Sequence, residues 1–159
     1  MSLLDKEPVK RVEKALKEFD QSISVIILEN TARTAKDAAE SLNCEVGAII
    51  KSLVFKAEET YVLSLIAGDK RCSLNKLKKI INKKDVSMAN PEEVKTQTGY
   101  TIGGVSPIGH LNPIKIFIDK SLERFNDLYA AAGHPNCVFK IDFKNIQKIT
   151  NGEIKELTE

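Results

Sequence analysis

The stretch "VGAIIKSLVFKAEETYVLSLIAG", residues 46–68, contains two apolar runs separated by a short polar segment. Both runs are rich in Ile, Leu and Val, and each has the length of a single strand. The polar segment between them is short enough to be one turn. The stretch therefore predicts a β-hairpin, and the rest of the chain can be arranged around it.

Predicted helices and strands alternate on both sides of this hairpin, and several helices begin at a capping residue such as Thr34 or Asn90. Helices are predicted over residues 7–20, 31–43, 72–85, 90–99 and 142–150, and further strands over residues 23–29, 113–119, 128–133 and 137–142. Because a hairpin lies among these strands, we expect a mixed sheet and not a purely parallel one. The prediction is an α/β protein with a single domain over residues 1–159.

The composition is ordinary for a globular protein, with 24 Lys and Arg residues against 22 Asp and Glu residues. A net charge of +2 argues against a strongly basic surface for nucleic acid, and we expect no DNA partner. No apolar run reaches the roughly 20 residues that span a bilayer, so we expect no membrane partner. Three widely spaced cysteines and no secretory start predict a soluble, cytoplasmic protein with reduced thiols.

Lys51 is the first candidate site residue, because it interrupts an apolar strand. By strand alternation its side chain shares a face with Ile49, Leu53 and Phe55. A buried ammonium group without a partner is costly, so this side chain must find a partner or open into a cavity. The alternative is that the other face forms the core and Lys51 extends into solvent.

A glycine-rich loop, "IGGVSPIGH" at residues 102–110, is the second candidate. Gly103 and Gly104 let a ligand approach main-chain N–H groups without a Cβ in the way, and Pro107 stiffens the segment. Such N–H groups can polarise an ester carbonyl or hold a phosphate. The loop lacks the spacing of a P-loop or of a dinucleotide-binding motif, and taken alone it is equally compatible with an ordinary wide turn.

His134 lies in a predicted turn between Gly133 and Pro135, where we expect it at the rim of a site. A rim imidazole can bond a hydroxyl group or move a proton near neutral pH, although many turn histidines only face solvent. No pair of His or Cys residues has metal-ligand spacing, so no metal and no cofactor are predicted. No serine or cysteine lies in a local motif of a catalytic nucleophile.

Two charged segments are candidates for contact with a nucleic acid. Residues 68–71, "GDKR", follow the hairpin and include Asp69. Residues 75–85, "NKLKKIINKKD", carry five lysines whose field can attract a polyanion. The same patterns are typical of a solvated turn and of a solvated helix face.

These segments, in this order, resemble the YbaK/prolyl-tRNA-synthetase editing-domain family of aminoacyl-tRNA deacylases. The matching segments are "AIIKSLVFK", "YVLSLIAGDKR", "NPEEVKTQTGYTIGGVSPIGH" and "YAAAGHPNCVFKID", which fall within residues 20–150. The resemblance implies one α/β domain with a central mixed, barrel-like sheet wrapped by helices. It implies an enzyme that hydrolyses the ester of a mischarged tRNA, typically Ala or Cys on tRNA(Pro), either as a free-standing protein or as a synthetase insert. The N-terminal helix, residues 1–20, lies outside the matched region.

The resemblance also assigns roles to the candidate residues. The family's pocket lysine corresponds to Lys51, its glycine loop to residues 103–107, and its glycine–histidine turn to Gly133 and His134. The predicted catalytic residues are Lys51, Gly103, Gly104 and His134. The predicted substrate-binding residues are Val105, Ser106, Pro107, Gly133 and, from the charged turn after the hairpin, Asp69.

In the implied mechanism, water attacks the aminoacyl ester, and the free ribose hydroxyl of the terminal adenosine helps to activate it. Main-chain N–H groups of the loop stabilise the oxyanion, and one such donor contributes about 3 kcal/mol. We expect Lys51 to face the loop across one cleft and to hold a phosphate or hydroxyl of the terminal nucleotide. Pocket size would exclude larger amino acids. The expected partners are a mischarged tRNA and possible association with an aminoacyl-tRNA synthetase.

The sequence leaves three other functions open. The same pocket could bind a tRNA end without hydrolysis. The chain could instead hydrolyse another small ester or thioester, or act as a phosphate-recognising metabolic enzyme. A third alternative is a protein-interaction domain that works in a complex with a synthetase.

Overall fold

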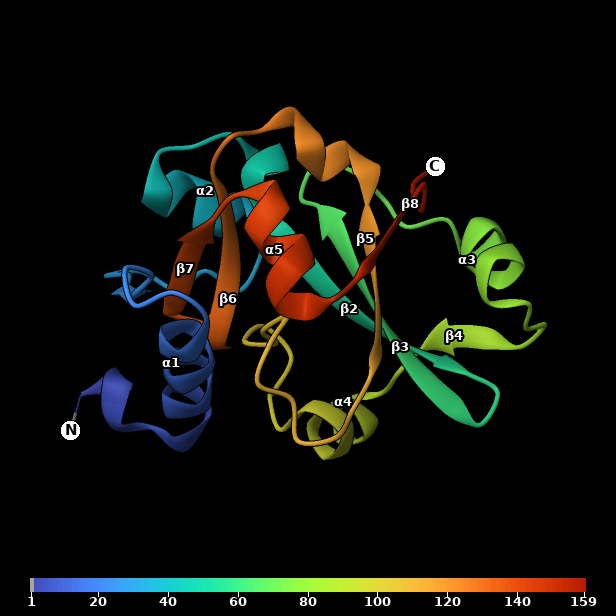
Figure 1. Ribbon diagram of the computed structural model, residues 1–159, viewed down its shortest axis with the longest axis horizontal. Coiled ribbons are helices and arrows are strands. Elements are labelled where there is room, and N and C mark those ends of the chain that lie inside the picture. The colour runs from blue at the N-terminus through green and yellow to red at the C-terminus, as the bar shows by residue number, and fades with distance from the viewer. Residues whose placement is uncertain (1) are drawn as a thin grey trace.

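The structure is a computed structural model that describes residues 2–159, and its strands form two sheets that lie side by side (Figure 1). The smaller sheet has the order β1-β7-β6 and consists of β1 (Val25–Ile27), β7 (Cys137–Ile141) and β6 (Leu128–His134). The larger has the order β4-β2-β3-β5-β8 and consists of β4 (Val86–Met88), β2 (Ile50–Ala57), β3 (Thr60–Ala67), β5 (Lys115–Asp119) and β8 (Glu153–Lys155). β2 pairs antiparallel with β3, whereas β3 and β5 run parallel, so the larger sheet is mixed.

Five α-helices surround these sheets in the described part of the chain. They are α1 (Glu7–Phe19), α2 (Ala35–Leu42), α3 (Leu74–Ile81), α4 (Pro91–Thr98) and α5 (Phe143–Thr150), with short 3-10 helices at Leu3–Asp5, Val46–Ala48 and Lys120–Arg124. The predicted caps are confirmed: the Thr34 hydroxyl accepts from the Asp37 N–H at 3.1 Å, and Asn90 forms a capping box with Glu93. None of the helices within residues 2–159 has the length and apolarity to cross a membrane.

The predicted hairpin is β2 and β3, which pair from Ile50 with Ala67 to Ala57 with Thr60. Because side chains alternate along a strand, the hairpin serves two separate apolar clusters. Ile50 and Val54 enter the main core, whereas Phe55 and Ala57 pack on the other face against α3 and its neighbours. Lys51 belongs to the second face, as strand alternation predicted.

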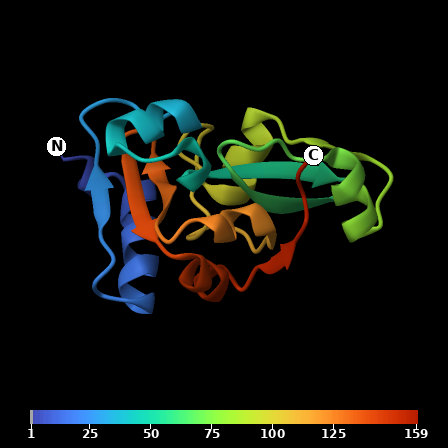
Figure 2. The same ribbon diagram turned by 90° about the horizontal axis from the view of Figure 1, so that it is seen from above.

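Helices α1 and α2 lie on opposite sides of the smaller sheet (Figure 2). Val9, Val12 and Leu16 of α1 are completely buried in the main core, which also contains Ala130 and Ala132 of β6. α2 packs its own buried alanines in a separate cluster with Ile49 and Tyr129. Each face of the smaller sheet is therefore packed against a helix.

The predicted α/β class is confirmed, but the predicted single, barrel-like sheet is not, because the two sheets of residues 2–159 do not close into a barrel. They meet at an isolated parallel bridge between Ile49 and Tyr129. Farther along the same edge, β2 pairs with β4, but only from Phe55 to Ala57. Residues 51–53 of β2 therefore keep an edge that no strand of the described chain covers, and the barrel stays open there.

Candidate active site

A cavity of about 340 Å³ lies between the uncovered edge of β2, the end of β6 and the glycine-rich loop. This volume is at the small end of the range for ligand pockets. Most of the wall is formed by small or apolar side chains from α2, β2, β6 and β7, among them Ala38, Ile50, Ala130, Val138 and Val105 of the loop. The cavity is thus suited to a small apolar group.

The mouth of the cavity combines exposed apolar side chains with one cation. Ile102 and Met88 line the cavity although their side chains are 59% and 57% exposed, so they lie where it opens to solvent. Arg33, which precedes α2, also lines the cavity. A bound molecule that extends out of the cavity would meet these three side chains first.

Gly104 brings the loop into direct contact with the turn at the end of β6. A Cβ at this position would lie 2.9 Å from the main-chain nitrogen of His134 and 3.0 Å from its Cα. These are main-chain atoms, so they cannot yield as the end of a flexible side chain would. Only glycine allows this approach, and the contact joins the two segments that were predicted to form the site.

The structure separates the two glycines that were predicted to supply main-chain donors. The Gly104 N–H is occupied, because it donates to the Thr101 carbonyl at 2.9 Å. Gly103 and Val105 line the cavity, and within residues 2–159 their N–H groups have no acceptor. Gly104 therefore supports the loop, whereas Gly103 and Val105 are the predicted loop residues on the cavity wall whose main-chain donors are unbonded within the described chain.

Ser106 and Pro107 do not reach the main cavity. Ser106 is completely buried, and its carbonyl accepts a hydrogen bond from His110 Nε2 at 2.7 Å. Pro107 lines a second hollow of about 460 Å³ on the α1 side of the loop. Of the predicted substrate-binding residues in the loop, only Val105 is a wall of the main cavity.

His134 is the last residue of β6, and its half-buried ring lines the cavity. The Asn136 N–H donates to His134 Nδ1 at 3.0 Å, so the ring proton of the neutral form is on Nε2. Burial lowers the pKa of His134, and the nearby Lys6 and Arg33 lower it further. The imidazole is therefore neutral at pH 7 and offers a ligand one N–H donor.

Lys51 lines the cavity along the edge of β2, but its ammonium group is turned to the opposite face of the sheet. There it donates to the Lys70 carbonyl. Burial lowers the pKa of Lys51, and the charge of Arg71 lowers it further, whereas Asp69 raises it. The expectation that the ammonium faces the glycine loop is not met, and its catalytic role stays a prediction.

Asp69 and Gly133 are outside the cavity lining. The Asp69 carboxylate accepts two hydrogen bonds from the Arg124 guanidinium, at 2.7 and 3.0 Å, which holds the pKa of Asp69 below its usual value. Gly133 packs against the start of α1, with φ of +89°. The structure thus does not bring Asp69 to the site, and it gives Gly133 a supporting position next to His134.

Sequence reasoning missed most of the cavity wall, including the polar or exposed side chains of Arg33, Ser52, Met88 and Ile102. Ser52 had a usable signal, because it is a polar residue on the strand face that Ile50 and Val54 bury. Its hydroxyl oxygen is buried and has no hydrogen-bond partner within residues 2–159. Arg33, Met88 and Ile102 had no such signal, since each is an ordinary residue of a loop or strand end.

The chain is similar to several known proteins. The candidate Cys-tRNA(Pro)/Cys-tRNA(Cys) deacylase EbsC of Enterococcus faecalis is 31% identical over 79% of this chain and 77% of its own length. The proline–tRNA ligase of Thermosipho melanesiensis is 32% identical over 65% of this chain, which spans only 18% of the ligase. The crystal structure of a candidate trans-editing enzyme for prolyl tRNA synthetase superposes with a TM-score of 0.91 at 35% identity, covering 97% of this chain and 98% of that one.

A family model described as the aminoacyl-tRNA editing domain matches residues 29–149. That range contains β2, the glycine-rich loop and the His134 turn, and it omits α1. The chain therefore belongs to the aminoacyl-tRNA editing domain family, which confirms the predicted resemblance and the predicted class of enzyme, an aminoacyl-tRNA hydrolase.

Proposed function

We propose that this protein is a trans-acting deacylase that hydrolyses the ester of mischarged tRNA(Pro) carrying alanine or cysteine. One observation carries the proposal: the glycine-rich loop, the His134 turn and the Lys51 strand edge line the same small apolar cavity. A tRNA of this kind is a cytoplasmic molecule, so the cytoplasm remains the predicted location. We propose further that residues 1–159 act as one editing domain, with α1 as part of it.

The size and chemistry of the cavity support a small amino acid. Alanine side chains at positions 38, 130 and 131 contribute to its wall, and so does Cys137. A volume of about 340 Å³ must hold the aminoacyl group together with part of the terminal ribose. A small cavity excludes a larger side chain more strongly than it favours a small one. Alanine and cysteine enter, and bulkier residues are rejected.

In the proposed reaction a water molecule attacks the ester carbonyl, and the electron pair of the C=O bond moves onto its oxygen. The free N–H groups of Gly103 and Val105 bind this oxyanion, each contributing about 3 kcal/mol. When the intermediate collapses, the C–O bond to the ribose breaks and the tRNA hydroxyl leaves with a proton. The adjacent ribose hydroxyl assists the attacking water, and the Nε2–H of His134 holds that hydroxyl in place.

Lys51 and Arg33 are the cations that we assign to the tRNA end. Arg33 is already at the mouth of the cavity. The Lys51 ammonium lies on the other side of an edge that no neighbouring strand covers, and its only described hydrogen bond is to the Lys70 carbonyl. Its flexible side chain can exchange that carbonyl for a phosphate when the nucleotide binds, because an anion is the stronger partner.

A deacylation panel tests this function. tRNA(Pro) charged with labelled alanine, cysteine, serine or proline is incubated with the protein, and acid-precipitable label is followed over time. We expect loss of alanine or cysteine and retention of proline. Binding of tRNA without loss of label would instead favour a binding module. Turnover of small esters that tRNA does not inhibit would favour a different hydrolase.

Ile102→Ser is expected to raise KM for the mischarged tRNA about tenfold, with kcat little changed. Ile102 offers an apolar surface at the cavity mouth, and losing such a contact costs about 1.5 kcal/mol or more. Steady-state kinetics with a tRNA titration measures the effect. Leu111→Ser is the matched control, because Leu111 is 56% exposed but does not line the cavity. Equal KM values for the two variants would remove Ile102 from substrate binding.

Deacylation is expected to be constant from neutral pH to pH 8 and to fall in acid as His134 becomes protonated. Burial and two nearby cations lower its pKa, so the neutral form persists below the usual histidine range. Protonation puts a hydrogen on Nδ1, so the ring loses the hydrogen bond from the Asn136 N–H that fixes its orientation. Because the folded-state pKa lies below the unfolded-state value, the associated stability is also lost as pH falls through the folded-state pKa.

Single-turnover rates across pH, corrected for spontaneous hydrolysis, measure this profile. In the His134→Asn variant the acid limb should vanish, with a partial loss of the plateau rate. An acid limb that stays at the same pH in this variant would assign the titration to another group.

A further inference from the structure

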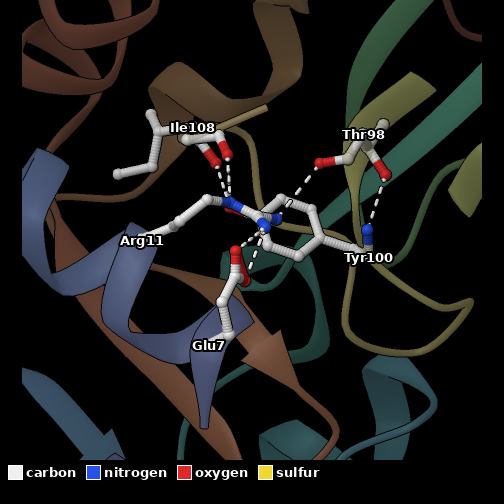
Figure 3. A network of polar contacts seen from close by, with 6 residues as sticks. Glu7, Arg11, Thr98, Tyr100 and Ile108 are labelled. Carbon is white, nitrogen blue, oxygen red and sulfur yellow. Dashed lines mark hydrogen bonds and ion pairs between the residues drawn. The ribbon is translucent and has the colours of Figure 1, made fainter. Parts of the chain in front are cut away.

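Helix α1 lies outside the residues that match the family, yet one of its side chains binds the glycine-rich loop directly. Arg11 Nε donates to the Gly109 carbonyl at 3.0 Å, and Arg11 also donates to the Thr98 carbonyl at 3.3 Å. Arg11 Nη1 donates to both oxygens of the Glu7 carboxylate, at 2.6 and 2.7 Å (Figure 3). One guanidinium group thus connects α1 to the end of α4, which leads into the loop, and to Gly109 near the end of the loop.

Tyr100, two residues before the start of the loop, completes this network (Figure 3). Its ring is 1% exposed and lies 4.8 Å from the Arg11 guanidinium carbon, in cation–π geometry. Its hydroxyl donates towards the carbonyls of Ile108 and Gly109, at 2.8 and 3.0 Å. Burial raises the pKa of Tyr100 to about 12, so the hydroxyl keeps its proton.

The contacts enclose the segment that holds the free donors. Thr98 and Tyr100 precede Gly103, and Ile108 and Gly109 follow Val105, so Arg11 and Tyr100 fix the loop on both sides of its ligand-facing part. The start of α1 also supports the other half of the site. A Cβ at Gly133 would lie 2.8 Å from the main-chain carbonyl of Pro8, so α1 and the His134 turn are in close contact.

We propose that Arg11 is a positioning residue for the deacylation reaction: from outside the family-matched region it holds the main-chain donors of the loop in register with His134. This inference rests on the proposed function of the same site. Arg11 does not line the cavity, so it acts through the loop and not on the substrate. A donor displaced by about 1 Å is expected to lower the rate on the order of 100-fold, because the geometry of the oxyanion site is lost.

Arg11→Gln tests the proposal, because it removes the forked guanidinium and keeps a polar side chain. We expect kcat to fall by about 30-fold to 100-fold, with KM for the tRNA within about twofold of wild type. Arg11→Lys keeps the charge but cannot reach Thr98, Gly109 and Glu7 together, so it should not restore kcat. Wild-type kcat in Arg11→Lys would overturn the proposal, since charge alone would then suffice.

Two control variants on the same helix separate positioning from a general effect of charge. Glu7→Gln removes the ion pair within α1 but leaves the Arg11 bonds to the loop, and it should lower kcat much less than Arg11→Gln does. Lys14→Gln makes the same charge change as Arg11→Gln at a side chain that is 79% exposed, and it should keep wild-type kcat. A loss in either control equal to that of Arg11→Gln would overturn the proposal.

Hydrogen exchange of the main-chain amides provides a measurement that needs no substrate. In Arg11→Gln we expect exchange of the hydrogen-bonded Gly104 and Ile108 amides to rise at least about tenfold, with β3 and β5 unchanged. A variant that melts at a lower temperature but keeps wild-type kcat and wild-type exchange in the loop would make Arg11 only structural and overturn the inference. If the wild-type protein deacylates no tRNA, the proposed function fails, and loop exchange still decides whether Arg11 positions the loop.

Discussion

Gly104→Ala is expected to lower kcat/KM for deacylation on the order of 100-fold. The added Cβ would lie 2.9 Å from the main-chain nitrogen of His134 and 3.1 Å from the carbonyl carbon of Gly133. Neither atom can move without moving β6, so the loop itself must withdraw from the turn. The main-chain donors of the loop and His134 then no longer keep the relative positions that the reaction needs.

Gly152→Ala is the matched control for this variant. A Cβ at Gly152 would meet the Ile118 side chain at 2.8 Å, so it creates a similar overlap in the larger sheet, where a flexible side-chain end can adjust. Single-turnover deacylation and thermal melting are measured for both proteins. We expect both to be folded, and only Gly104→Ala to lose activity. Turnover of Gly104→Ala at the wild-type rate would show that contact between the loop and the turn is not needed.

Lys51→Met is expected to lower kcat/KM at least about 100-fold while the melting temperature changes by only a few degrees. Methionine keeps most of the apolar length of the side chain, so it removes the ammonium group and little of the packing. Within residues 2–159 the lost ammonium has one hydrogen bond, to the Lys70 carbonyl, and we assign it to the terminal nucleotide when the tRNA is bound. The substitution should therefore lower the deacylation rate much more than the melting temperature.

Lys56→Met on the same strand is the control, because the Lys56 ammonium lies 3.3 Å from the Glu93 carboxylate and is away from the cavity. Deacylation rates and melting temperatures of the two variants decide between the roles of Lys51. Activity of Lys51→Met equal to that of Lys56→Met would remove Lys51 from the mechanism. A Lys51→Met protein that does not fold would identify the residue as structural.

Local patterns were enough to predict most helices and strands. The hairpin follows from two apolar runs around a turn, and α2 and α4 begin directly after the predicted caps Thr34 and Asn90. β4 and β8 were not predicted, because each has three residues and forms by pairing with a distant segment. Val86 pairs with Ala57, and Glu153 with Phe117, so neither strand leaves a periodic pattern in its own sequence.

The sequence was enough to predict the motifs of the candidate site but not the contacts that its side chains make. Lys51, Gly103, Gly104 and His134 were predicted as catalytic residues from residue type and order. All of them except Gly104 line the cavity. Asp69 was included because a charged turn follows the hairpin, but Arg124, 55 residues away, binds its carboxylate. No local pattern shows which distant cation will reach a given acid.

Taken by itself, the sequence determined the hairpin, the capped helices, the composition of the loop and the family to which the chain belongs, because each is encoded in neighbouring residues. Only the tertiary structure decided that the two sheets stay open beside Ile49 and Tyr129, and that the uncovered edge of β2 becomes a cavity wall. It also decided that the Gly104 N–H is occupied and that Arg11 holds the loop. These outcomes depend on which donors and acceptors meet after distant segments pack, and that pairing is set by the geometry of the whole fold.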